Sequence, residues 1–119
     1  MESLSKLSVK MDDIIQYGYI ALRQFPKSEK FVLATRIADV MWEIAVQIDS
    51  ACNTTSRQYK LQYMGKADLE LKRLKVMVRN SMKLEFLPFK KYEYWSGLNV
   101  ELGRCADAVE SRGRGAIEC

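Results

Sequence analysis

Residues 34–51 read ATRIADVMWEIAVQIDSA, and this stretch decides the fold class. Its apolar residues recur at alternating steps of three and four, which is the repeat of one face of an α-helix. The repeat comprises Ala34, Ile37, Met41, Ile44, Ile48 and Ala51, and it is flanked by Phe31, Val40 and Ala45. The stretch is therefore predicted to form one amphipathic helix that buries this face.

The residues around this stretch supply the start and stop signals of the helix. Ser28 is a suitable N-cap, and Glu29 places a carboxylate in the first turn, near the positive end of the helix dipole. Residues 53–56, Asn-Thr-Thr-Ser, carry short polar side chains that compete for backbone hydrogen bonds and favour turns. The helix is thus predicted to start at Ser28 and to break at residues 53–56.

Three further amphipathic helices are predicted on either side of this one. The first ends at Phe25-Pro26, and its inward face comprises Leu4, Leu7, Met11, Ile14, Ile15, Gly18, Ala21, Leu22 and Phe25. The next covers residues 57–86, and its inward face comprises Met64, Ala67, Leu71, Leu74, Val78 and Ser81. Pro88 suits the first turn of the last helix, whose apolar face comprises Tyr92, Trp95, Leu98, Leu102 and Ala106.

These four helices predict the architecture. None of them can bury its apolar face alone, and short turns join them, so the expected fold is all-α, an antiparallel up-down four-helix bundle over residues 1–110. The periodicity is lost from Ser111 onward, which predicts a flexible tail over residues 111–119. A chain of 119 residues is long enough for one domain with a core of its own.

The sequence also indicates the cellular compartment. The N-terminus lacks the apolar stretch of a secretory signal, and no apolar run is long enough to cross a membrane. The three cysteines, Cys52, Cys105 and Cys119, show no C-x-x-C spacing, which fits a reducing compartment. We expect a cytoplasmic protein in which the cysteines are small core residues plus one tail thiol.

Positive charge is concentrated in one part of the chain. Residues 57–91 contain ten Lys or Arg and three Asp or Glu, although the net charge of the whole chain is only +4. At about 100° per residue, a single arc of the third predicted helix holds Arg57, Lys72, Lys75, Arg79 and Lys83, and Lys90 and Lys91 extend it past Pro88. Such a row suits the phosphates of a nucleic acid or an acidic partner protein, whereas a solvated helix face is the plainer alternative.

Two apolar residues lie beside this arc. Leu69 and Val76, two turns apart, point away from the predicted core. A subunit contact is one interpretation, because an apolar strip outside a bundle marks a site of association. Isolated exposed apolar residues are also common, so chance placement stays an alternative.

The sequence lacks residue types and motifs on which common catalytic sites depend. The sequence contains no histidine and no glycine-rich phosphate loop. We therefore expect no catalytic residues, no metal and no cofactor. Among the aromatic residues near Lys91, Tyr92 and Trp95 are assigned to the core, which leaves Tyr94 as the exposed one.

Four short motifs, in order along the predicted helices, carry a resemblance to a known family. They are Phe25-Pro26-Lys27-Ser28-Glu29-Lys30-Phe31, Arg36-Ile37, Tyr92-Glu93-Tyr94-Trp95 and Glu101-Leu102-Gly103-Arg104. Over residues 8–104 the chain resembles the four-helix-bundle proteins typified by the accessory variability determinant of diversity-generating retroelements, and their relatives, the 23S rRNA intervening-sequence proteins. It departs from them after Arg104, where residues 105–109, Cys-Ala-Asp-Ala-Val, replace a glycine- and tryptophan-containing end.

The resemblance implies a function. Proteins of this kind are basic homopentamers without catalytic activity, which bind the retroelement's reverse transcriptase and its template RNA and support mutagenic copying. We therefore expect a non-catalytic accessory protein that binds RNA, and possibly DNA, through the basic row. A protein–protein scaffold, or an rRNA intervening-sequence protein whose basic row docks an acidic partner, is the alternative.

Overall fold

The computed structural model describes residues 4–116, and side chains over residues 4–109. Four long helices and one single-turn helix make up this part of the chain: α1 (Leu4–Leu22), α2 (Lys27–Lys30), α3 (Leu33–Asn53), α4 (Arg57–Lys83) and α5 (Phe89–Ala116). The six apolar residues of the 34–51 repeat are all buried, the most exposed being Ala34 at 7%. This confirms the amphipathic helix on which the fold prediction depends.

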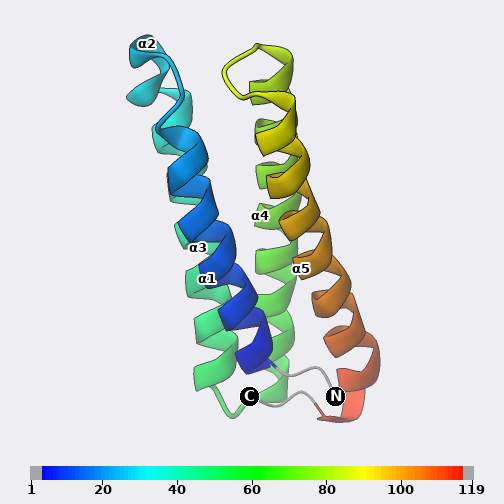
Figure 1. Cartoon of the computed structure of the whole chain (residues 1–119). Helices are drawn as coiled ribbons and strands as arrows, with labels where there is room; N and C mark the ends of the chain where they lie inside the picture. Colours follow the sequence, from blue (N-terminus) through cyan, green and yellow to red (C-terminus); the bar gives the residue numbers. More distant parts are fainter. Residues whose placement is uncertain (1–3, 117–119) are drawn as a thin grey trace.

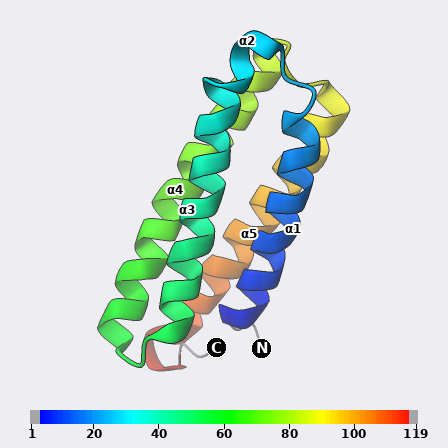
Figure 2. The same ribbon diagram turned by 90° about the vertical axis from the view of Figure 1, so that its left-hand side faces the viewer.

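The long helices form an antiparallel up-down bundle (Figures 1 and 2). Each neighbours the next around the bundle, in the order α1, α3, α4, α5 and back to α1, so α1 and α4 lie diagonally opposite. The bundle is 46 Å long and 23 by 19 Å across. Short α2 and the turn between α4 and α5 lie at one end, and the start of α1 lies at the other (Figure 1). The predicted fold class is thus confirmed.

The core consists of the predicted inward faces. Leu4, Leu7, Ile37, Met41 and Leu74 are fully buried, and so is Trp95 of α5. Tyr92, predicted to lie in the core, is half-buried against it, and Tyr94 is exposed, as the sequence predicts. Gly18 permits the close approach of α1 to α3, because a Cβ atom there would lie 2.5 Å from Met41 Sδ.

The connection between α1 and α3 differs from the prediction. Ser28 is not an N-cap, since α2 begins at Lys27 after Pro26 and has no side-chain cap. The helix also breaks at Phe31 and Val32 and restarts at Leu33. Phe31, predicted to flank the core, is 91% exposed. Apolar spacing missed this break because the repeat of α3 begins only at Ala34.

The start of α4 agrees with the sequence prediction, whereas its end does not. Ser56 is the N-cap, and its Oγ accepts a hydrogen bond from the Tyr59 N–H at 3.3 Å. At the other end the helix stops at Lys83, three residues before the predicted Phe86. Glu85 has a positive φ of 67°, and the Phe86 N–H donates to Ser81 O at 2.9 Å, as in a Schellman motif.

Helix α5 extends further than the sequence indicates. Its backbone is helical to Ala116, although a flexible tail was expected from Ser111. Cys105, Ala106 and Val109, in the segment that departs from the resembled family, are buried in the core. Residues 117–119, including Cys119, lie outside the described residues, and the flexible tail stays a prediction. No helix within residues 4–116 has both the length and the hydrophobicity to span a bilayer.

Candidate nucleic-acid interface and association surfaces

Four cations of the predicted row form a continuous surface on the C-terminal half of α4. Lys72, Arg79 and Lys83 are exposed, and Lys75 is half-buried. We call these four residues the basic stripe. Among the described residues, the single ion pair formed by the stripe joins Lys72 Nζ to Asp68 Oδ2 at 3.2 Å. This pair leaves the Lys72 side chain 70% exposed, and surface pairs of this kind contribute about 0–1 kcal/mol. The stripe is therefore accessible to an anionic ligand.

Lys75 connects the stripe to α5. Its Nζ lies 3.4 Å from the position that a Cβ atom would occupy on Gly103, so its side chain extends along α5. The stripe therefore faces outward from α4 on the side next to α5. Gly103 belongs to the Glu-Leu-Gly-Arg motif singled out in the sequence, and a Cβ atom there would be in van der Waals contact with the Lys75 ammonium.

Arg57 lies on the same side of α4 but far from the stripe. It is the first residue of α4, and it is about 22 Å along the helix axis from Lys72 at 1.5 Å per residue. Leu61, Gly65 and Asp68 occupy this side of the helix in between. Arg57 would therefore reach the same ligand only if that ligand followed most of the length of α4.

Lys90 does not extend the stripe on the same face. Lys90 is exposed, and it lies one helical turn before Tyr94, whose ring centroid is 4.6 Å from that of Tyr17 in α1. Lys90 therefore lies on the α1 side of α5, whereas the stripe lies on α4. Lys91 is half-buried. A binding role for these two lysines stays a prediction.

Leu69 and Val76 are exposed on α4, at 60% and 47%. On the helix they are rotated from Lys75 by about 120° and 100°, so they face away from the side that meets α5. An apolar pair and the basic stripe therefore occupy adjacent parts of the outer face of α4. The role of Leu69 and Val76 as a subunit contact stays a prediction.

A larger apolar surface lies between α1 and α3, where sequence reasoning did not place one. Trp42 and Val46 of α3 are exposed at 49% and 54%, and Tyr19 of α1 at 40%. The Trp42 Nε1–H donates a hydrogen bond to Tyr19 Oη at 2.8 Å, which holds the two rings together. The available signal was the i, i+4 pair of Trp42 and Val46, which lies outside the buried repeat of α3.

This surface is hollowed, and we call it the α1–α3 groove. One hollow of about 450 Å³ is lined by Tyr19, Leu22, Arg23, Lys30, Ala34, Thr35, Ala38, Asp39 and Trp42. A second, of about 370 Å³, is lined by Ser8, Met11, Asp12, Trp42, Ala45, Val46 and Asp49. Trp42 lines both hollows, so they are neighbours along the same pair of helices.

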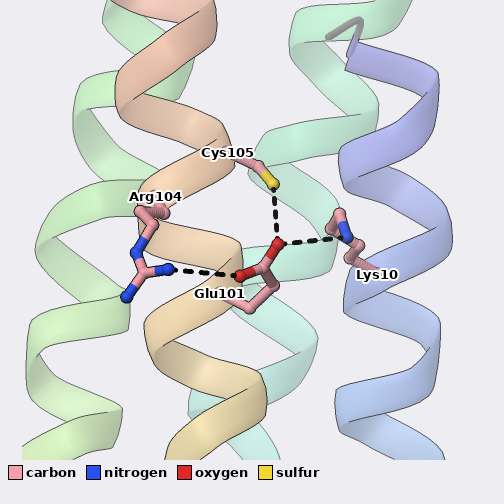
Figure 3. A network of polar contacts seen from close by, with 4 residues as sticks. All are labelled: Lys10, Glu101, Arg104 and Cys105. Carbon is pink, nitrogen blue, oxygen red and sulfur yellow. Dashed lines mark hydrogen bonds and ion pairs between the residues drawn. The ribbon is translucent and has the colours of Figure 1, made fainter.

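A polar network joins α5 to α1 around Glu101 (Figure 3). Glu101 Oε1 lies 3.7 Å from Lys10 Nζ and accepts a hydrogen bond from the Cys105 thiol at 3.6 Å. Arg104 Nη1 lies 4.0 Å from Glu101 Oε2, at the limit of an ion pair. The Arg104 side chain is 77% exposed, so this weak pair leaves it accessible.

A second contact between α1 and α5, that of Tyr17 with Tyr94, affects the pKa of Tyr17. Burial raises the pKa of Tyr17 above its usual value of 10.0, and the nearby Tyr94 phenol raises this pKa further. Tyr17 is therefore neutral at physiological pH and contributes no charge to these surfaces. Within residues 4–109, no group of three or more His, Cys, Asp or Glu side chains is placed to hold a metal ion.

These features define a class of protein: an all-helical bundle whose outer surface carries a cationic stripe on one helix and an apolar groove between two others. A model of the family described as bAvd-like, the bacterial accessory variability determinants, matches residues 6–112. The chain belongs to this family. The match runs through residues 105–109, where the sequence departs from the pattern that we expected. Neither a curated protein nor a solved structure gives a significant match.

Proposed function

We propose that this chain is a non-catalytic accessory protein of a diversity-generating retroelement. In this role it binds the reverse transcriptase and the template RNA as a homopentamer, and it supports mutagenic cDNA synthesis. Membership of the bAvd-like family supports the accessory role. The observation that carries the RNA contact is the basic stripe, four neighbouring cations on one helix with a single weak ion pair among the described residues.

The chemistry of the stripe suits an RNA backbone. The guanidinium of Arg79 can donate two parallel hydrogen bonds to a phosphate, whereas the ammonium groups of Lys72 and Lys83 act as mobile point charges. Consecutive members lie three or four residues apart, which is about 4.5–6 Å along the helix axis. This spacing is close to the distance between successive phosphates of an RNA strand, so each cation can meet a different phosphate.

The salt dependence of binding tests the RNA contact. Each phosphate that the protein neutralises contributes about 0.7–0.9 to the slope of log affinity against log salt concentration. In a variant with Lys72, Lys75, Arg79 and Lys83 all replaced by Gln, we expect the slope to flatten by roughly 3. The measurement is the affinity for a fluorescent RNA oligonucleotide between about 50 and 200 mM salt.

A matched control carries the same loss of charge elsewhere. The exposed residues Arg23, Lys27, Lys30 and Arg36 lie at the α2 end of the bundle, and their replacement by Gln also removes four positive charges. The control should keep most of the slope. Equal slopes for the two variants would show that the affinity follows net charge and not the stripe. If the wild-type protein does not bind RNA at low salt, the acidic-partner alternative is favoured instead.

A further inference from the structure

The α1–α3 groove combines apolar side chains with carboxylates that have no cationic partner. Asp12, Asp39 and Asp49 line its two hollows. Within the described residues, none of these carboxylates forms an ion pair, and Asp49 Oδ2 accepts a hydrogen bond only from the Asn53 amide, at 3.0 Å. The two cations of the groove, Arg23 and Lys30, line only the hollow nearer α2. The hollow at Val46 is therefore apolar and acidic.

The outer face of α4 has the opposite character. Leu69 and Val76 are exposed on it, and exposed cations flank them, with Lys72 and Arg73 in the turn between them. Lys72 and Arg73 each pair with a carboxylate of α4 itself, Asp68 at 3.2 Å and Glu70 at 3.5 Å, and both pairs are open to solvent. An amphipathic helix of this kind, with apolar anchors and cations around them, complements an apolar and acidic groove.

We propose that the α1–α3 groove of one copy receives the outer face of α4 of a second copy, with Leu69 and Val76 packed against Trp42 and Val46. Asp12 and Asp49 then lie near the flanking cations. The two surfaces lie on different helices of the same bundle, and α1 and α4 are diagonally opposite. Each copy therefore offers one surface to each of two neighbours, which is a heterologous contact and forms a ring when the rotation between copies closes.

This contact leaves part of the stripe open to RNA. Leu69 and Val76 are rotated by about 100° or more from Lys75, so Lys75 and Arg79 on the side of α4 next to α5 stay open when the apolar pair is covered, whereas Lys72 lies at the edge of the contact. This inference rests on the proposed function, in which the chain assembles with copies of itself. It assigns the two faces through which that assembly takes place. Assembly is measured by mass and RNA binding by its salt slope, so the failure of one is distinguishable from the failure of the other.

Mixing two defective variants tests the contact. The first, Val46→Arg, places a cation in the groove and leaves the face of α4 intact. The second, Leu69→Glu with Val76→Glu, places carboxylates on α4 and leaves the groove intact. By light scattering after size exclusion, the wild-type protein should be oligomeric and each variant monomeric. An equimolar mixture of the two variants should give a 1:1 dimer, because one intact groove and one intact α4 face remain and the dimer cannot extend.

Two controls make the result specific. Val9 is a valine that is 61% exposed and lines neither hollow, so Val9→Arg should keep the wild-type mass. Circular dichroism and the thermal midpoint verify that every variant is folded. A monomeric wild-type protein, a variant that keeps the wild-type mass, or a mixture that stays monomeric would each overturn the proposal.

Discussion

Glu85 is the one non-glycine residue in the described part of the chain that has a positive φ. Its φ is 67°, in the left-handed region, where a residue with a Cβ costs about 1–2 kcal/mol relative to right-handed backbone. It follows the C-cap of α4, the position where glycine is preferred. Because glycine also loses more entropy on folding, we expect Glu85→Gly to raise the free energy of unfolding by about 0.5–1 kcal/mol. Urea unfolding measures this change.

An alanine variant at the same position serves as the control for this prediction. Glu85→Ala removes the carboxylate but keeps the Cβ atom, so it should stay within about 0.5 kcal/mol of the wild-type protein. A gain with alanine equal to the gain with glycine would mean that the charge, and not the backbone conformation, sets the cost.

Glu85 also shows why the end of α4 could not be predicted at the level of single residues. The usual signal for a helix end is glycine at this position, and here a good helix former occupies it. The apolar residues Phe86 and Leu87 continue the pattern and favour a longer helix. By contrast, Ser56 has both the side chain and the position of an N-cap, and the structure confirms a helix start there.

At the scale of helices, Gly65 and Gly18 both lie within helical backbone but have different surroundings. Gly65 of α4 is exposed, with no atom within 4 Å of the position of an added Cβ, whereas a Cβ on Gly18 of α1 would lie 2.5 Å from the sulfur of Met41. Gly65→Ala should raise the free energy of unfolding by about 0.8–1 kcal/mol through helix propensity alone. Gly18→Ala should lower it by about 1 kcal/mol, because Met41 is fully buried and overpacking outweighs that gain.

Thermal and urea unfolding of the two alanine variants measure these changes side by side. Since the substitution is the same, the difference between the variants isolates the helix–helix contact. Equal stabilisation by both would show that Met41 moves aside without cost, and that Gly18 does not set the approach of α1 to α3.

The faces of the helices were predictable because burial follows one repeat along each helix. The buried residues of α3 and α4 include the predicted repeats, which depend only on spacing within a single helix. Lys60 of α4 is buried as well, although the repeat did not predict it. The direction of Lys90 did not follow from spacing along α4, because a turn at residues 84–88 separates the two helices. The lone turn α2 was missed for a related reason: four residues are too few for any repeat.

At the scale of the whole molecule, the α1–α3 groove was beyond sequence reasoning. Its walls come from two helices, and Tyr19 and Trp42 meet across 23 positions of sequence. The basic stripe and the pair Leu69 and Val76 were predictable, because each lies on one helix. The sequence therefore indicated one half of the proposed subunit contact, whereas the only signal for the other half was the i, i+4 pair of Trp42 and Val46.

Association of whole molecules has a consequence for thermal stability. If folded copies associate and unfolded chains do not, a higher protein concentration stabilises the folded state, and Tm becomes dependent on concentration. We expect the Tm of the wild-type protein to rise by roughly 5 °C over a hundredfold range of concentration. The variant with Leu69→Glu and Val76→Glu should lack this rise, because its exposed substitutions prevent association and leave the core intact. Val9→Arg should keep the rise, whereas a wild-type Tm that is independent of concentration would show that stability does not depend on association.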